Sequence, residues 1–223
     1  MSNHVVSAVV VANGVPSDPT IFDTLLRAAD IVVAADGGAR ALIERDLPLT
    51  TIVGDLDSLP PDLLDRWQTH GGDVRRYPRA KDETDLELAV TEAMRRGARR
   101  VVVLGALGGR VDHQTANLLL LAHPSLDGID VALLDDGVRV VGVKDAATLV
   151  GWPGDVLSLL PVTALVEGVV TTGLRYPLVG ETLALGSPRG VSNVFTAQRV
   201  TVRVRAGTLL ALHTWTGKRA VRW

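Results

Sequence analysis

The chain contains no cysteine. This absence excludes disulfides, thiolate metal sites and cysteine nucleophiles. Only five histidines are available as soft metal ligands. A bound metal is therefore expected on carboxylates, which are the ligands that suit Mg²⁺.

An excess of charge of one sign is also absent, with 23 Lys and Arg against 25 Asp and Glu and a formal net charge of −2. That balance argues against a surface that coats nucleic acid. No cation precedes Arg27, so the charged region of a signal peptide is lacking. The longest apolar runs, such as Val5–Ala12, fall well short of the roughly 20 residues that a membrane span needs. We expect a cytoplasmic globular protein with no nucleic-acid or membrane partner.

The first 135 residues alternate between short β-branched runs and segments with helical start and stop signals. The runs have the continuous apolar character of strands that are buried on both faces. Between them, Thr84 and Glu87 form a capping box that predicts a helix ending at Gly97. The pattern predicts a doubly wound, mostly parallel α/β sheet. The expected strands are Val5–Val11, Ile31–Ala35, Thr51–Val53, Val101–Leu104 and Ile129–Leu134.

The pattern changes near Asp135-Asp136-Gly137. From there Gly or Pro recurs at short intervals, mostly of fewer than ten residues, and Val200–Arg205 alternates strictly between apolar and polar residues. Short strands with regular turns predict a small β-sandwich. We therefore expect an α/β domain over residues 1–136 and a β domain over residues 137–223.

The segment Gly54-Asp55-Leu56-Asp57-Ser58 directly follows the third expected strand. If it is extended, Asp55 and Asp57 point to the same side and can face one cation. The carboxyl end of a parallel strand is also where open α/β sheets hold ligands. The alternative is that the segment is only a turn that caps the next helix.

A second acidic cluster, Lys81-Asp82-Glu83-Thr84-Asp85, begins the capped helix. One acid is expected there from the helix dipole, but three acids beside a single Lys exceed what capping needs. Asp85 could complete a carboxylate set with Asp55 and Asp57 that holds Mg²⁺ together with phosphate oxygens. Lys81 would then meet the phosphate as a point charge.

A glycine-rich segment follows the fifth expected strand and leads into a helix. Glycines after a strand allow the backbone to approach phosphates, and the helix N-terminus adds amide donors. Arg110 supplies the fork geometry that suits phosphate, whereas His113 is an orienting residue or, alternatively, a base. The segment runs Gly105-Ala106-Leu107-Gly108-Gly109-Arg110-Val111-Asp112-His113.

Further loops of small residues follow the first two strands, at Ala12-Asn13-Gly14 and Ala35-Asp36-Gly37-Gly38-Ala39. Each loop alone is a weak signal. Together with the loops at Gly54 and Gly105, they indicate a sheet edge that admits a large anionic ligand.

The ordered set of motifs resembles that of the thiamine pyrophosphokinase family, from about Val9 to Leu212. The similar segments are Asp36-Gly37-Gly38-Ala39, Gly54–Ser58, Lys81 with Thr84-Asp85, Gly105–Asn117, Gly173–Leu178 and Val191-Ser192-Asn193. The resemblance implies transfer of the pyrophosphoryl group of ATP to the hydroxyl of thiamine, with release of AMP. It also implies a homodimer whose sites are shared between subunits.

The resemblance further implies roles for individual residues. Asp55, Asp57 and Asp85 would hold Mg²⁺, and Asp112 and Lys81 would act near the same phosphates. The nucleotide would be lined by Asn13, Asp36, Gly37, Gly105, Gly108, Gly109, Arg110 and His113. Thiamine would be faced by Tyr176, Ser192 and Asn193, and either Tyr176 or Trp215 would stack on it.

Some alternatives stay open at this stage. Either Asp85 or Asp112 could accept the hydroxyl proton. Arg40 stands where many members of the family have Asn. A non-catalytic thiamine or nucleotide sensor, or a Mg²⁺-dependent kinase of another small alcohol, could share the fold. Separation of AMP from ADP after incubation with ATP, Mg²⁺ and thiamine distinguishes these functions.

Overall fold

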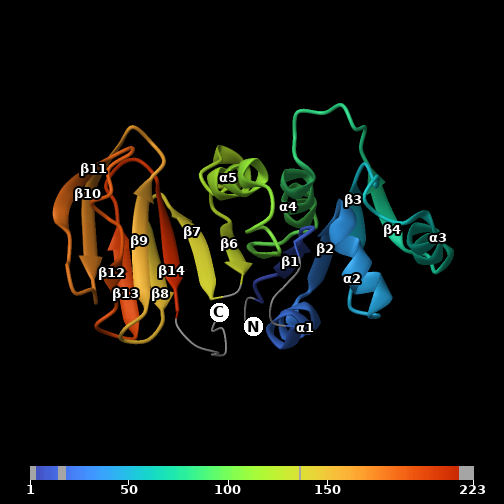
Figure 1. The fold of residues 1–223 in the computed structure, drawn as a ribbon, viewed down its shortest axis with the longest axis horizontal. Helices are drawn as coiled ribbons and strands as arrows, with labels where there is room; N and C mark the ends of the chain where they lie inside the picture. The colour runs from blue at the N-terminus through green and yellow to red at the C-terminus, as the bar shows by residue number, and fades with distance from the viewer. Residues whose placement is uncertain (1–3, 15–18, 136, 216–223) are drawn as a thin grey trace. The chain divides into compact units, whose positions relative to one another are not determined.

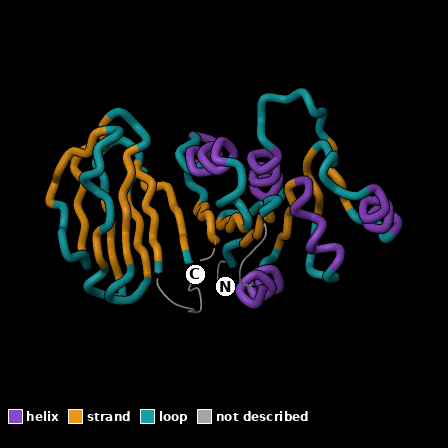
Figure 2. Tube along the Cα trace, viewed as in Figure 1, coloured by secondary structure: helices purple, strands orange, loops and turns teal. Residues whose placement is uncertain are grey.

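The computed structural model describes residues 4–14, 19–135 and 137–215. The chain forms two compact units. The first extends to Asn117 and resumes at Asp127, and the second combines Leu118–Leu126 with the chain from Gly137 onward. Figure 2 shows helices interspersed with strands in the first part of the chain and strands with loops in the last part.

The first unit is built on six parallel strands in the order β6-β5-β1-β2-β3-β4. Its central strands are buried along most of their length because helices cover both faces. The strands are β1 (Ser7–Val11), β2 (Ile31–Ala35), β3 (Thr51–Gly54), β4 (Asp73–Arg76), β5 (Arg100–Leu104) and β6 (Asp130–Asp135).

The order of the strands explains the two helical layers. From β1 to β4 the chain adds strands in one direction, and it then returns to β5 on the other side of β1. Because such crossovers are right-handed, the helix of this return connection lies on the opposite face of the sheet from the helices of the earlier connections. Figure 1 shows α4 above the sheet and α1 and α2 below it. The helices are α1 (Pro19–Ala28), α2 (Ala39–Glu44), α3 (Pro61–Thr69), α4 (Asp85–Arg95) and α5 (Val111–Leu120), with 3₁₀ turns η1 (Asp36–Gly38) and η2 (Pro124–Leu126).

The second unit consists of two antiparallel four-stranded sheets, ordered β12-β9-β14-β7 and β11-β10-β13-β8. Alternating burial along β9 and β13 shows that one face of each strand contributes to the core. The strands are β7 (Val138–Val143), β8 (Ala146–Val150), β9 (Val156–Pro161), β10 (Leu165–Thr172), β11 (Val179–Ala184), β12 (Asn193–Val194), β13 (Arg199–Arg203) and β14 (Leu209–Thr214).

The predicted fold class, an α/β part followed by a β part, is confirmed. All five expected strands of the first unit are present, and the hydroxyl of Thr84 caps α4 by accepting a hydrogen bond from Glu87 N at 3.1 Å. The sequence analysis missed two elements, β4 and α2. The strand β4 is largely polar, and α2 has only six residues, which is too short for a helical period to be read. Among the described helices, none has the length and apolarity required to cross a membrane.

Candidate active site

Four loops meet at the carboxyl end of the parallel sheet, after β1, β2, β3 and β5. Because β5 lies on one side of β1 and β2 on the other, the chain reverses direction at β1. Open α/β sheets bind ligands outside the strands at such a point.

The loops after β1 and β5 are joined through their backbones. Gly14 N donates to Gly105 O at 3.0 Å, and Ala12 N donates to Leu104 O at 2.8 Å. A Cβ on Gly14 would collide with the Gly105 carbonyl, and Gly105 itself has φ +69°. Glycine is therefore required at both positions for the two loops to approach each other.

The loop after β2 packs against the same β1 segment. A Cβ on Gly38 would collide with Val11 O, and a Cβ on Gly37 would lie 2.5 Å from Asn13 Oδ1. The Asn13 side chain therefore lies directly against Gly37, so the structure brings together two residues that were predicted for the nucleotide.

Three carboxylates converge where the loops after β2 and β3 meet. Oxygen atoms of Asp36, Asp55 and Asp57 all lie within 4.8 Å of one another. Asp36 is buried, has φ +44°, and its Oδ1 finds no hydrogen-bond partner within the described part of the chain. A buried carboxylate oxygen without a partner is costly unless a cation occupies its neighbourhood.

The route by which Asp55 and Asp57 meet differs from the expected one. The segment is not extended, because Leu56 has φ +68° and Asp57 N donates to Asp55 Oδ1 at 3.2 Å in a tight turn. A turn is present, as in the alternative reading, but its side chains do not cap α3, whose N-cap is Pro60 with no side-chain hydrogen bond, and the two carboxylates still converge. Sequence reasoning placed Asp36 near the nucleotide but did not group it with these acids.

Lys81 and Asp85 stand beside this cluster. Lys81 Nζ lies 2.9 Å from Asp85 Oδ1, and a Cβ on Gly54 would lie 3.2 Å from that oxygen and 3.1 Å from Asp36 Cβ. Burial acts to lower the pKa of Lys81, but the hydrogen bond and the charge of Asp85 outweigh it. The charges of Asp55 and Asp36 add to this effect, so the pKa of Lys81 stands above its usual value.

One cation at the cluster was not predicted. Arg79 Nη2 lies 3.5 Å from Asp57 Oδ2, and the Arg79 side chain is 84% exposed. It comes from the same β4–α4 loop as Lys81. Its position in an arginine-rich segment, Arg75-Arg76-Tyr77-Pro78-Arg79, was the only available sequence signal.

The loop after β5 is held by side chains of α5. Gly108 N donates to Gln114 Oε1 at 3.0 Å, and Asn117 Nδ2 donates to Ala106 O at 2.8 Å. Gly108 and Gly109 have φ +89° and +70°, and a Cβ on either would meet open space. The loop therefore presents backbone on its outer side.

Arg110 and Asp112 form an exposed pair at the start of α5. Arg110 donates to both Asp112 oxygens, at 3.1 and 2.6 Å, and His113 N donates to Asp112 Oδ1 at 3.0 Å. These bonds, with that of Arg110 the largest, lower the pKa of Asp112 to about 2. His113 is exposed, and Asp112 is not among the three converging carboxylates.

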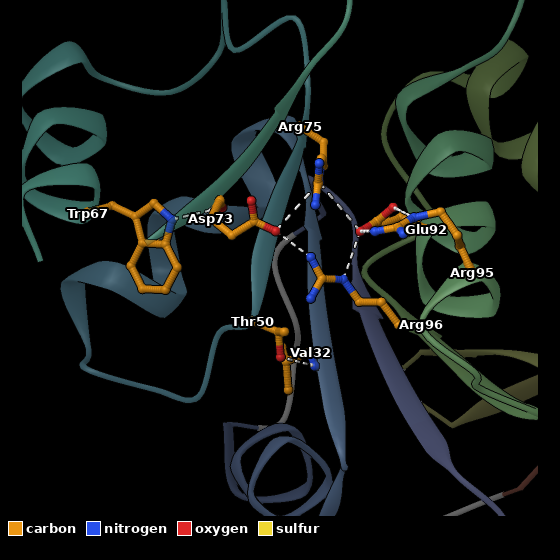
Figure 3. Close-up of polar contacts among 8 residues, drawn as sticks. All are labelled: Val32, Thr50, Trp67, Asp73, Arg75, Glu92, Arg95 and Arg96. Atoms are coloured by element: carbon orange, nitrogen blue, oxygen red, sulfur yellow. Dashed lines mark hydrogen bonds and ion pairs between the residues drawn. The ribbon is translucent and has the colours of Figure 1, made fainter. Parts of the chain in front are cut away.

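An ion-pair network fixes β4 to α4, the two elements that flank the loop carrying Lys81 (Figure 3). The buried Glu92 accepts from Arg95 at 2.7 and 2.8 Å and from Arg96 at 2.7 Å. Arg96 also reaches Asp73, and Arg75 lies between Asp73 and Glu92 at 3.5 and 3.7 Å. Chiefly through its hydrogen bond to Arg95, the network holds the pKa of Glu92 below its usual value.

In the second unit, the structure brings Tyr176 and Asn193 together. Asn193 Oδ1 accepts from Tyr176 N at 3.1 Å, and Asn193 Nδ2 donates to Tyr176 O at 2.6 Å. Ser192 has φ +61°, and its N donates to Ser158 Oγ at 3.1 Å. Tyr176 is 63% exposed, whereas Trp215 is half-buried against His213 with ring centroids 5.5 Å apart.

Comparison with known proteins identifies the family. A family model described as "Thiamin pyrophosphokinase, catalytic domain" matches residues 22–133, just over half of the 223 residues. A second, "Thiamin pyrophosphokinase, vitamin B1 binding domain", matches residues 145–209. The chain belongs to the thiamine pyrophosphokinase family.

Relatives in this family span most of the chain. Thiamine pyrophosphokinase 1 of Arabidopsis thaliana is 28% identical over 222 residues, covering 87% of this chain and 81% of the relative. The thiamine pyrophosphokinase of Bacillus subtilis is 25% identical over 190 residues, covering 81% and 85%. The solved thiamin pyrophosphokinase family protein of Enterococcus faecalis has a TM-score of 0.83 at 29% identity and covers 95% of this chain and 100% of its own. The activity of the chain is accordingly that of a thiamine pyrophosphokinase, an enzyme.

The predicted site residues divide between the two family models. The catalytic-domain model of the thiamine pyrophosphokinase family covers the converging carboxylates, Lys81, Asp85 and the loop after β5, but it begins after Asn13. The vitamin B1 binding model covers Tyr176, Ser192 and Asn193, and it ends before Trp215.

Proposed function

We propose that the chain transfers the pyrophosphoryl group of ATP to the hydroxyl of thiamine, giving thiamine diphosphate and AMP. The observation that carries this proposal is the convergence of Asp36, Asp55 and Asp57 at the sheet edge where the phosphate loops end. Three carboxylates next to glycine loops would repel a triphosphate unless a divalent cation lay between them.

The residues fit Mg²⁺. The donors are carboxylate oxygens, which hard cations prefer, and the unpartnered buried oxygen of Asp36 is accounted for by a bound cation. We propose that Asp36, Asp55 and Asp57 hold the ion. Asp85, which was expected in the same set, would instead lie next to these ligands and pair with Lys81. When bound, Mg²⁺ neutralises charge on the phosphates and orients them.

The remaining residues of the first unit bind and position the nucleotide. Lys81 is proposed to neutralise the transferred phosphates, because its raised pKa keeps it charged at neutral pH. Arg110 would exchange its exposed contact with Asp112 for a phosphate, which it can bind with two parallel hydrogen bonds. We assign the nucleotide-facing backbone to Gly105, Gly108 and Gly109.

Acceptance of the thiamine proton is assigned to Asp85 rather than Asp112. A group with a pKa of about 2 is a weak base, and this is the pKa of Asp112 while Arg110 pairs with it. Asp85 also pairs with a cation, Lys81, but it lies beside the converging carboxylates, where a proton could be received close to the phosphates.

Thiamine is proposed to bind to the second domain, residues 137–223, at the segments that contain Tyr176, Ser192 and Asn193. The exposed Tyr176 ring is the better stacking candidate, because Trp215 already packs on His213. Residues 1–136 would supply ATP and Mg²⁺ binding. We further propose a cytoplasmic homodimer in which these two domains of different subunits complete each site.

The test is incubation of the protein with ATP, Mg²⁺ and thiamine, followed by separation of the nucleotides and thiamine esters. We expect AMP and thiamine diphosphate in equal amounts, and no AMP when thiamine or Mg²⁺ is omitted. Asp57→Asn should lower kcat at least about 100-fold, the scale of losing one electrostatic stabiliser of the transition state. Release of ADP would instead show γ-phosphoryl transfer, and binding of both substrates without turnover would indicate a sensor.

A further inference from the structure

A buried acid–histidine pair lies in the second unit, apart from the polar atoms assigned to either substrate. His213 Nε2 lies 3.1 Å from Asp155 Oδ2, and the two residues are 4% and 1% exposed. The same Asp155 oxygen accepts a hydrogen bond from Trp152 N at 2.8 Å. A Cβ on Gly151 would lie 2.7 Å from that oxygen and 2.8 Å from the His213 ring, so the pair is tightly enclosed.

Both members of the pair contact Phe195, which is 1% exposed. The His213 ring stacks on the Phe195 ring with centroids 4.6 Å apart and an interplanar angle of 18°. Phe195 N donates to Asp155 O at 2.9 Å, and Gly154 N donates to Phe195 O at 2.9 Å. The position of the Phe195 ring is thus held by stacking on His213, and its backbone is held by hydrogen bonds to Gly154 and Asp155.

Phe195 belongs to the chain segment that holds the proposed thiamine residues. Leu174 and Phe195 form an antiparallel bridge, and Arg175 N donates to Val194 O at 2.8 Å. Asn193 lies two residues before Phe195, and its side chain accepts a hydrogen bond from Tyr176 N and donates one to Tyr176 O. A displacement of Phe195 would therefore be passed to Tyr176 through both backbone and side-chain hydrogen bonds.

We propose that Asp155 and His213 are positioning residues for thiamine, which set the place of Tyr176 and Asn193 by fixing Phe195. The proposal rests on the proposed function, since it assigns the thiamine site to these segments. Burying a polar pair is costly, and an apolar pair of similar volume would stabilise the unit at least as well. A hydrogen bond of defined direction restricts the His213 ring to one orientation, and an apolar contact would not.

The burial of His213 supports this reading. Burial lowers the pKa of His213, and the hydrogen bond to Asp155 opposes that effect without overcoming it. The ring is therefore neutral near pH 7 and donates its Nε2 proton to the Asp155 carboxylate. Stacking on Phe195 then involves an uncharged ring.

The experiment measures thiamine affinity directly, by calorimetry without nucleotide, and steady-state kinetics in both substrates. Asp155→Ala and His213→Gln should each raise the KM and the Kd for thiamine at least about tenfold, as expected when a binding group is displaced by a fraction of an ångström. The kcat at saturating thiamine and the KM for ATP should stay within about twofold of the wild type. Asp155→Asn, whose amide oxygen can still accept from both Trp152 N and His213 Nε2, should restore thiamine affinity to within about threefold.

Val202→Ala is the matched control, because it opens a cavity at a fully buried residue of β13 in the other sheet of the same unit. Equal loss of thiamine affinity in this control and in the pair variants, at equal loss of thermal stability, would overturn the proposal. A rise of similar size in the KM for thiamine and the KM for ATP would also overturn it. If Asp155→Ala does not fold, His213→Gln and Asp155→Asn decide the question. Failure of the proposed function is distinct, because the wild type itself would then neither bind thiamine nor form AMP.

Discussion

Lys81 Nζ lies 2.9 Å from Asp85 Oδ1, and the Lys81 side chain is only 10% exposed. Burial acts to lower the pKa of this ammonium group, and the surrounding carboxylates more than offset that effect. The pair therefore depends on the acidic cluster, and the cluster in turn has one of its charges compensated by Lys81.

Replacing Lys81 by Ala should lower kcat for AMP formation at least about 100-fold, because the charge on the transferred phosphates loses a fixed counter-charge. Steady-state assays at saturating ATP and thiamine measure this effect. Lys144→Ala is the control, since Lys144 is an exposed residue that donates to His123 O in the second unit, and its kcat should not change. Equal rates for the two variants would remove Lys81 from the catalytic machinery.

Asp36→Asn should raise the Mg²⁺ concentration needed for half-maximal activity at least about tenfold, because the site loses one of three carboxylates. Titration of activity with Mg²⁺ at fixed ATP measures the change, and chelation should abolish activity in the wild type. Asp65→Asn, an exposed acid on α3, serves as the control. An unchanged Mg²⁺ requirement in Asp36→Asn would leave the buried oxygen of Asp36 without an explanation.

Gly14→Ala should separate the loops after β1 and β5, because its Cβ would collide with the Gly105 carbonyl. We expect a loss of about 1–3 kcal/mol in the free energy of unfolding, the usual cost of overpacking, and a raised KM for ATP. Urea unfolding and ATP kinetics measure the two effects. Gly97→Ala is strained in its backbone but meets open space away from these loops, so its KM for ATP should be unchanged.

Glu92→Gln should destabilise the protein by about 3 kcal/mol, because it removes the buried carboxylate shared by three arginines. The pKa of Glu92 is lowered in the folded state, so its contribution to stability is present above about pH 4.5, the ordinary value for Glu, and is lost as pH falls through the folded pKa. Urea unfolding between pH 7 and pH 3 should show this loss in the wild type and a weaker one in the variant. Glu44→Gln, which breaks an exposed pair with Arg40, should cost less than about 0.5 kcal/mol.

Mixing inactive Asp57→Asn and Asn193→Ala chains should restore activity if each site combines two subunits. A statistical mixture contains about half heterodimer with one intact site of two, so recovery should approach about a quarter of wild-type activity. Subunit exchange is verified by labelling the two chains. Exchange without recovery would mean that Asp57 and Asn193 serve the same site from one chain.

Much of the first unit follows from local signals. Strands such as Ile31–Ala35 are continuous apolar runs because helices cover both faces of the sheet, and Thr84 marks the start of α4 because its hydroxyl satisfies a free backbone amide. The loop residues expected near the phosphates could be predicted because the carboxyl ends of parallel strands lie at the same edge of the sheet.

The rest depends on contacts between distant residues. Asp36 joins Asp55 and Asp57 only because β2 and β3 are neighbours and because Leu56 turns the chain, neither of which leaves a periodic pattern. The pairing of Asp155 with His213, 58 residues later, depends on the register of β14 against β9. The short polar strand β4 has no apolar run, since it lies at the end of the sheet.

That place at the end of the sheet bears on self-association. In the described part of the chain β4 pairs with no strand but β3, and Trp67 Nε1 of α3 donates to one of its carbonyls, Asp73 O, at 3.2 Å. An open edge of this kind can recruit further strands and seed aggregates. With only four residues, of which Arg75 and Arg76 carry positive charge, β4 is a poor template for such growth. The polar character that conceals the strand from sequence reasoning thus also disfavours the pairing of further strands at this edge.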